Sequence, residues 1–252
     1  MMKLYKYRDF SAADESRFAQ LEEIVFDQRF WCARPDTLND PEEFSWGLDL
    51  GETAETRGLV EALLLRERGL SAEVARDRVA AAFASGLFEH YVGEVVADMV
   101  GRCRDEFGLI CFGTSADNLC LWQRYAGDGA GVCVELEVPS ALLGKQLHRV
   151  HYLPAKTMHV DDYLRVKDPE YMRRMFSLAL LSKPAPWLSE AEIRFISKRH
   201  GVSVYIYDSK VTGLYLGHSL APAARARVVE MAQRGGENGP VPCFSGASFA
   251  GS

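Results

Sequence analysis

Two glutamates and an arginine occupy alternate positions in Glu190-Ala191-Glu192-Ile193-Arg194. We predict that this segment lies in a β-strand, where alternate side chains point to the same face. Ala191 and Ile193 would then face the core. The opposite face would carry Glu190, Glu192 and Arg194. Glutamate is a poor strand former, so this pattern indicates either a functional pair or a solvated face with an exposed ion pair.

Two carboxylates on one strand face can support glycosyl-transfer chemistry. One can orient a ribose hydroxyl, while the other stabilises an oxocarbenium-like centre. The segment that contains Glu190 and Glu192 is therefore the first candidate site, and the aromatic Trp187 just before it is a candidate wall of a binding pocket.

A second polar segment, Asn39-Asp40-Pro41-Glu42, follows a predicted strand over Val25 to Ala33. Asn and Asp bond their own backbone and Pro fixes φ, which predicts a rigid turn. The alternative is a loop that presents Asp40 or Glu42 into a cleft. Magnesium held by Asp40, Glu42 and Glu190 is a third hypothesis, although their spacing does not indicate a metal site.

Trp122 and Tyr125 lie three residues apart on a short helix that we predict from Asn118 to Tyr125, so they share a face. We expect Trp122 to fill the core and Tyr125 to form a pocket wall. The glycine-rich loop that follows lacks the spacing of a phosphate-binding fingerprint. The six cysteines contain no C-x-x-C pair and the histidines no H-E-x-x-H spacing, so no metal is predicted.

Charge and hydropathy exclude several classes. The net charge of −6 disfavours a broad, non-specific nucleic-acid surface, although a local basic patch is compatible with it. No run approaches the roughly 18 to 20 apolar residues that span a bilayer. The start of the chain lacks the apolar core of a signal peptide, so we expect no membrane partner and a cytoplasmic location.

The pattern of elements predicts one α+β domain over residues 1–234 with a mostly antiparallel sheet. Apolar residues at helical spacing predict a helical insertion at about 52–107. Residues 131–138 alternate cleanly between Val or Leu and polar side chains, as in a half-buried strand. Residues 235–252 are rich in Gly, Ser and Pro, which predicts a flexible tail.

Short motifs occur in a specific order along the chain. They are Leu4-Tyr5-Lys6-Tyr7-Arg8, Leu38-Asn39-Asp40-Pro41-Glu42, Ile110-Cys111-Phe112, Trp122-Gln123-Arg124-Tyr125-Ala126, Gly131-Val132-Cys133-Val134-Glu135, Lys183, Trp187, Glu190-Ala191-Glu192-Ile193-Arg194 and Leu214-Tyr215-Leu216-Gly217. Over roughly residues 3 to 220, this set resembles the bacterial family catalogued as domain of unknown function 2971. The chain departs from that family at Arg124 and near Ala130, where histidine is common, and at Glu43, where an aromatic residue is common.

The order of an aromatic-basic first strand, a polar turn and a late Glu-x-Glu strand is also similar to the ADP-ribosyltransferase layout. That resemblance implies a split sheet and NAD as co-substrate. Arg8 or Tyr7 would grip the nicotinamide ribose side. Glu192 would stabilise the oxocarbenium ion, and Glu190 would engage the acceptor. No metal is implied, because the leaving nicotinamide is already cationic and only developing positive charge needs stabilisation.

These residues support three functional hypotheses. The first is an NAD-consuming enzyme, an ADP-ribosyltransferase or NAD glycohydrolase. The second is a non-catalytic module that binds a small molecule, nucleotide or partner, with Trp122, Tyr125 and Trp187 as walls and the glutamates paired with Arg194 or Arg8. The third is a magnesium-dependent hydrolase or nuclease. An enzyme of the first kind should keep Glu192 unpaired in a concave pocket, whereas a binding or structural role should hold it on an arginine.

Overall fold

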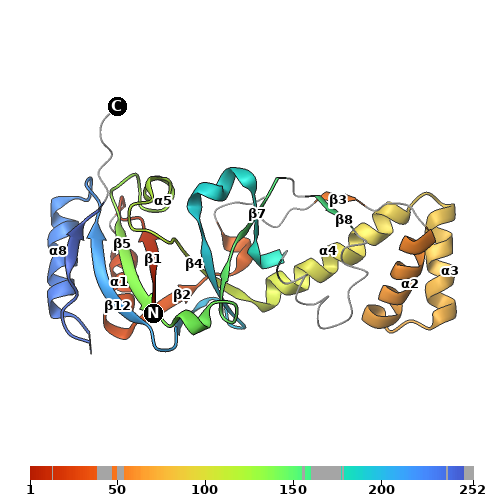
Figure 1. The fold of residues 1–252 in the computed structure, drawn as a ribbon, viewed down its shortest axis with the longest axis horizontal. Coiled ribbons are helices and arrows are strands. Elements are labelled where there is room, and N and C mark those ends of the chain that lie inside the picture. The colour runs from red at the N-terminus through yellow and green to blue at the C-terminus, as the bar shows by residue number, and fades with distance from the viewer. Residues whose placement is uncertain are drawn as a thin grey trace. The chain divides into compact units, whose positions relative to one another are not determined.

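The computed structural model describes residues 1–12, 14–38, 47–49, 54–154, 157–159, 177, 179–236 and 238–246. They divide into two compact units, where the sequence predicts one domain. Unit one comprises residues 1–34, 107–150 and 186–252, and unit two comprises 35–106 and 151–185. The α+β class is confirmed, because helices and mostly antiparallel strand pairs both contribute to the fold (Figure 1).

Unit one holds most of the strands. Its elements are β1 (Met2–Arg8), α1 (Glu15–Asp27), β2 (Arg29–Cys32), β4 (Gly108–Phe112), α5 (Leu119–Tyr125), β5 (Val132–Val138), the 3-10 helix η2 (Ser140–Leu142), β6 (Leu147–Arg149), the 3-10 helix η3 (Ala185–Glu190, in this unit from Pro186 on), β10 (Ile193–Ser197), β11 (Val202–Tyr205), β12 (Lys210–Leu216), α8 (Pro222–Arg234) and β13 (Cys243–Ser245).

The strands of unit one form three hydrogen-bonded groups: β1-β5-β12-β13, β4-β10-β6 and the ribbon β11-β2. All pairs in them are antiparallel except β12 with β13, which is parallel. Two isolated bridges, Tyr5 with Gly113 and Ala33 with Leu109, join β1 and the chain after β2 to the β4 segment. β10 thus lies between two neighbours, which matters for the charged residues at its start.

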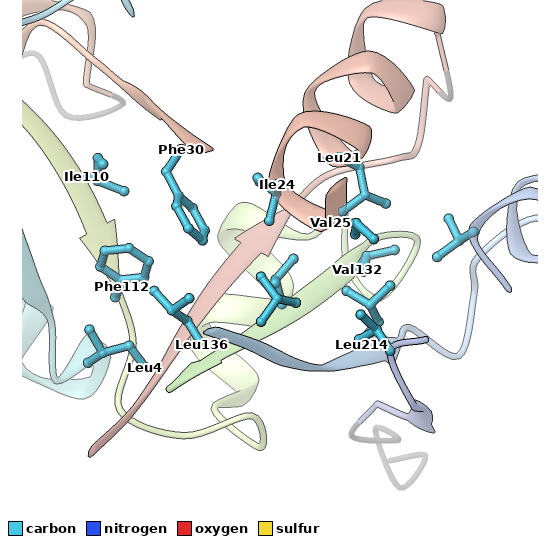
Figure 2. Packing of buried hydrophobic residues seen from close by; sticks show 14 of the residues in the cluster. Leu4, Leu21, Ile24, Val25, Phe30, Ile110, Phe112, Val132, Leu136 and Leu214 are labelled. Atoms are coloured by element: carbon cyan, nitrogen blue, oxygen red, sulfur yellow. The ribbon is translucent and has the colours of Figure 1, made fainter. Parts of the chain in front are cut away.

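The main core lies between the four-stranded group and helices α1 and α8. The alternation predicted for residues 131–138 is confirmed, since Val132, Val134, Leu136 and Val138 all point into this core. Figure 2 shows Leu21, Ile24 and Val25 of α1 reaching toward the strands that carry Val132 and Leu214. Burial of these apolar side chains is the main stabilising contribution to unit one.

The start of α1 and its end are set by local chemistry. The Asp14 side chain accepts a hydrogen bond from the Arg17 backbone N–H at 2.9 Å and caps the helix. Gln28 ends it in the left-handed region, with φ 53°. The prediction of a strand from Val25 to Ala33 is therefore wrong at its start. Val25 packs as the last apolar residue of the helical stripe, and the strand begins only at Arg29.

A second, smaller cluster covers the other face of β5. Tyr5 and Tyr7 of β1 pack there with Cys133 of β5 and with Leu121 and Trp122 of α5. β5 is therefore buried on both faces rather than half-buried, because α5 lies over the side that alternation assigns to Cys133 and Glu135.

The prediction of a flexible tail from residue 235 onward is wrong for the first part of that range. β13 pairs with β12 in parallel, with Leu214 opposite Cys243, and Val241 is buried. The described chain is therefore part of the fold as far as residue 246.

Unit two contains the predicted helical stretch. Its elements are the 3-10 helix η1 (Pro35–Thr37), β3 (Gly47–Asp49), α2 (Ala54–Arg68), α3 (Ala72–Ala84), α4 (Phe88–Glu106), β7 (His151–Leu153), β8 (Thr157–His159) and β9 (Ser182–Pro184). Helices α2 and α3 lie side by side (Figure 1), with Val60 and Leu64 of α2 and Val79 of α3 buried. β3 pairs with β8 and β7 with β9, both in parallel.

No helix in the described ranges has both the length and the apolar character needed to cross a membrane.

Candidate functional site

The Glu190 to Arg194 segment is not a continuous strand. Glu190 ends η3, and Ala191 adopts a left-handed conformation with φ 46°. The Ala191 N–H donates to the Leu188 carbonyl at 3.2 Å, which closes a turn just before β10. The prediction that Ala191 faces the core and that Glu190 shares a strand face with Glu192 is therefore wrong. Ala191 is exposed, and strand geometry begins only at Ile193.

Glu192 and Arg194 form a buried ion pair. Arg194 Nε donates to Glu192 Oε1 at 2.7 Å, and Nη2 donates to Oε2 at 3.2 Å. Arg194 is 0% exposed and Glu192 6%. Two parallel bonds of this kind are the strongest geometry that an arginine and a carboxylate adopt. Because both side chains are buried, the predicted open face is part of the interior of the unit.

Glu190 belongs to a different ion pair, formed with α5. Its Oε1 accepts a hydrogen bond from Tyr125 at 3.0 Å and another from Arg124 Nη1 at 3.1 Å. The Arg124 guanidinium also lies over the ring of Trp187, 4.3 Å from the ring centroid. Three residues of the predicted site, Glu190, Tyr125 and Trp187, are thus brought together around an arginine that sequence reasoning did not select.

This second pair is open on one side only. The Glu190 side chain is 1% exposed, whereas that of Arg124 is 40% exposed. The acid is therefore buried beneath the base, and the base faces solvent. We call the group Arg124, Tyr125, Trp187 and Glu190 the Arg124 platform.

Asn118 holds together the two elements that form the Arg124 platform. Its side-chain oxygen accepts from the Leu121 N–H at 3.2 Å and caps α5. Its amide nitrogen donates to the Ser189 carbonyl of η3 at 2.7 Å. One side chain therefore starts the helix that carries Arg124 and ties it to the turn that carries Trp187.

The two predicted residues on β1 do not join the platform. The Arg8 guanidinium donates to the Gln20 side chain on α1, and burial, with a smaller contribution from Arg17, lowers the pKa of Arg8 to about 10. Tyr7 donates to the Ser115 carbonyl at 2.6 Å, and burial raises its pKa. The side chains of Arg8 and Tyr7 therefore make hydrogen bonds within unit one and do not contribute to the Arg124 platform.

Trp122 fills the core, as predicted. It is fully buried, its Nε1 donates to the Ala116 carbonyl at 2.7 Å, and its ring meets Tyr7 edge-on at 5.3 Å between centroids. It is not a pocket wall.

Three further predicted residues, Asn39, Asp40 and Glu42, lie outside the described residues, as does Glu43. In the part of the chain that is described, no group of three His, Cys, Asp or Glu side chains is placed to hold a metal ion. The hypothesis of magnesium at Asp40, Glu42 and Glu190 stays a prediction.

A carboxylate that the sequence did not single out has a dense set of donors. Glu135 on β5 is 3% exposed, and its oxygens accept from Thr212 at 2.7 Å and from Tyr5 and Tyr215, each at 3.1 Å. The Lys3 ammonium lies 3.0 Å away. Burial raises the pKa of Glu135, but these hydrogen bonds together outweigh it and hold the pKa below its usual value. The alternation of β5 assigns Glu135 to the face opposite Val132 and Val134. That assignment is the feature of the sequence from which Glu135 could have been selected as a candidate residue.

Comparisons of the chain with models of protein families, with curated proteins and with solved structures find no match. The resemblances to the domain of unknown function and to the ADP-ribosyltransferases therefore stay predictions from sequence. The function of the chain has to be inferred from the chemistry of its own side chains.

Proposed function

We propose that this protein is a binding module for a small planar, anionic ligand of the nucleotide type, recognised by the Arg124 platform. The observation that carries the proposal is the asymmetry of the Arg124–Glu190 pair. A buried acid, which also accepts from Tyr125, bonds a half-exposed arginine that lies over a tryptophan ring.

A guanidinium held in this way is prepared for recognition. Its inner face lies on Trp187, and one nitrogen is used by Glu190. The outer face of a guanidinium can stack on a planar ring, and its remaining N–H groups can donate to a phosphate or carboxylate. Because Glu190 and Trp187 already fix the guanidinium, little side-chain entropy is lost on binding.

The glutamates have a positioning role in this proposal. An NAD-consuming reaction needs a carboxylate that faces the ribose, but both oxygens of Glu192 accept hydrogen bonds from Arg194. Glu190 is likewise held by Arg124 and Tyr125. An ion-paired Glu192 is the geometry expected of the binding hypothesis rather than of the enzyme hypothesis.

Calorimetric titration with adenosine monophosphate tests the proposal, with adenosine and inorganic phosphate as the separate halves of the probe. We expect binding of the nucleotide and weaker binding of either half. The variant Arg124→Met keeps an apolar side chain over Trp187 and removes the charge, so it should abolish measurable binding. Arg234→Met is the matched control, because Arg234 is also exposed and lies over an aromatic ring, that of Phe26 at 5.1 Å.

Two further measurements address the other hypotheses. Release of nicotinamide from NAD by the wild-type protein, lost in Glu192→Gln at unchanged fold, would overturn the proposal in favour of the enzyme. A rise in melting temperature with magnesium alone would favour the metal-dependent hydrolase or nuclease. We expect neither result.

A further inference from the structure

Arg8, at the end of β1, is a half-buried cation whose hydrogen-bond partner is neutral. Its Nη2 donates to the side-chain oxygen of Gln20 on α1. Among the described residues, Arg8 forms no ion pair. Taking a guanidinium out of water without a carboxylate beside it costs free energy, because its charge is not compensated. A positive charge in this state is suited to an anion from solution.

A second arginine lies on the same side of Arg8. Arg17 and Gln20 are three residues apart on α1 and share a face of the helix, and the bond to Gln20 brings Arg8 to that face. Burial and, to a smaller extent, the charge of Arg17 lower the pKa of Arg8 to about 10. Two like charges held close together repel, and an anion beside them relieves that repulsion.

Lys6 adds a third positive group. Lys6 and Arg8 are alternate residues of β1, so their side chains leave the strand on the same face. The Lys6 ammonium donates to the Cys111 carbonyl at 3.0 Å and, within the described ranges, forms no ion pair. Burial, the larger cause, and the charge of Arg8 both lower the pKa of Lys6.

The unused N–H groups of Arg8 are open to solvent. Among the described side-chain atoms that are sealed from solvent, those without a hydrogen-bond partner are Gln28 Oε1 and Ser209 Oγ. Because Arg8 makes its bond through Nη2, its Nε and Nη1 must reach solvent, and the same holds for the amide nitrogen of Gln20. A guanidinium and an amide N–H next to each other are good donors to an oxyanion.

Two carboxylates have to be set against these charges. Asp9 Oδ2 lies 3.9 Å from Arg17 Nη2, and Asp9 Oδ1 accepts from the Ser11 N–H at 2.7 Å. Glu192, which acts on Lys6, has both oxygens on Arg194. Asp9 therefore neutralises at most one of the three basic side chains, and Arg8 is left without a counter-ion.

We propose that Arg8, Arg17 and Gln20 bind a free oxyanion of the sulfate or phosphate type. The anion would accept from Nε and Nη1 of Arg8 and from the Gln20 amide, with Arg17 supplying the second positive charge. These residues belong to β1 and α1, whereas the Arg124 platform is carried by α5 and η3, so this site does not depend on the proposed function. With so few donors we expect a millimolar dissociation constant, and micromolar nucleotide leaves the site empty.

Equilibrium dialysis of radiolabelled sulfate against the full-length chain tests the proposal. Every protein in this experiment carries Arg124→Met, which removes the platform as a second anion site. We expect one bound sulfate per chain. Adding Arg8→Met should abolish binding, and adding Arg17→Met should weaken it by about tenfold. Arg29→Met is the matched control, because Arg29 is exposed and also donates to a neutral oxygen, the Ser203 carbonyl at 2.9 Å.

Thermal melts separate a binding role of Arg8 from a structural one. At constant ionic strength, sulfate at about ten times its dissociation constant should raise the melting temperature by about 3–6 °C. Sulfate stabilises proteins in general, so the quantity that matters is the difference in this rise between the proteins with and without Arg8→Met. In chloride alone, Arg8→Met should melt no lower than its parent, because it removes an uncompensated charge.

Several outcomes would overturn the inference. One is the absence of bound sulfate, and another is equal binding with and without Arg8→Met. Several weak sulfates per chain, reduced by Arg29→Met as much as by Arg8→Met, would show general attraction to surface arginines instead of a site. A large fall in the melting temperature of Arg8→Met in chloride, with an undiminished response to sulfate, would make Arg8 a structural residue.

Discussion

Two ion pairs that share one short segment, Glu190 to Arg194, have opposite designs. Arg194 and Glu192 are both buried and bond through two parallel hydrogen bonds. Arg124 and Glu190 share one such bond, and only the acid is buried. The closed pair keeps both charges inside the fold, whereas the open pair keeps a cation at the surface in a fixed orientation. The two glutamates therefore differ in role although they are the same residue type. The exposure of the arginine partner distinguishes them, because a buried arginine serves the fold and an exposed one can meet a ligand.

The largest effect should come from breaking the closed pair. Arg194→Met leaves the Glu192 carboxylate buried without its arginine partner, which costs about 3–5 kcal/mol of unfolding free energy. Urea denaturation measures it. The double variant Arg194→Met with Glu192→Leu replaces the pair by apolar groups and should recover most of the loss. If the single variant is as stable as the wild type, the pair is not structural.

Glu192→Gln sharpens the same comparison. A catalytic carboxylate could lose its charge with little change in thermal midpoint. Because Glu192 is held by Arg194, we expect this variant to melt at a lower temperature. Its free energy of unfolding should fall by about 1–3 kcal/mol. An unchanged midpoint would contradict the structural role.

Weakening the acid of the open pair should affect both fold and binding. Glu190→Gln keeps the shape but replaces the carboxylate that accepts from Arg124 and Tyr125. We expect the free energy of unfolding, measured in urea, to fall by about 1–2 kcal/mol. We also expect a weaker affinity for adenosine monophosphate. If stability falls and affinity does not, the acid does not orient Arg124 for binding.

Glu135 extends the comparison to pH. Its pKa in the folded state lies below the usual value of 4.5, because the hydrogen bonds outweigh burial. A depressed pKa stabilises the fold above the unfolded value, and that stability is lost as pH falls through the folded value. Thermal melts from pH 6 downward should therefore show a fall below about pH 4.5 that is smaller in Glu135→Gln. Parallel curves for the two proteins would contradict this.

Removing the half-exposed arginine should cost less stability than removing the buried one. Arg124 is 40% exposed and Tyr125 still donates to Glu190 in Arg124→Met, so we expect the free energy of unfolding to fall by about 1–2 kcal/mol, less than in Arg194→Met. A large loss of stability would mean that Arg124 is a structural residue like Arg194, and the distinction between the two pairs would fail.

Local chemistry made part of this fold predictable. The alternation around Val134 identified a strand and its core face, and Asn118 marked a helix start. The errors arose where one residue satisfied two patterns. Val25 fits both a strand and the end of a helical stripe, and Ala191 fits strand alternation until its left-handed backbone is known.

The pairings of the site could not be predicted in the same way. Arg124 and Glu190 are 66 residues apart and meet where the Asn118 side chain ties α5 to η3. Arg194 is two residues from Glu192 on the same segment, but the complete burial of its side chain is a property of the folded unit that the local sequence does not reveal. The sequence identified three members of the platform, Glu190, Tyr125 and Trp187, but not the arginine at its centre.

The Arg124 platform is tested most directly by calorimetric titration of adenosine monophosphate into the wild type, Arg124→Met and Arg234→Met, each shown to be folded by its melting temperature. We predict binding to the wild type and to Arg234→Met, and none to Arg124→Met. Equal binding to all three proteins, or no binding to the wild type, would contradict the proposed function.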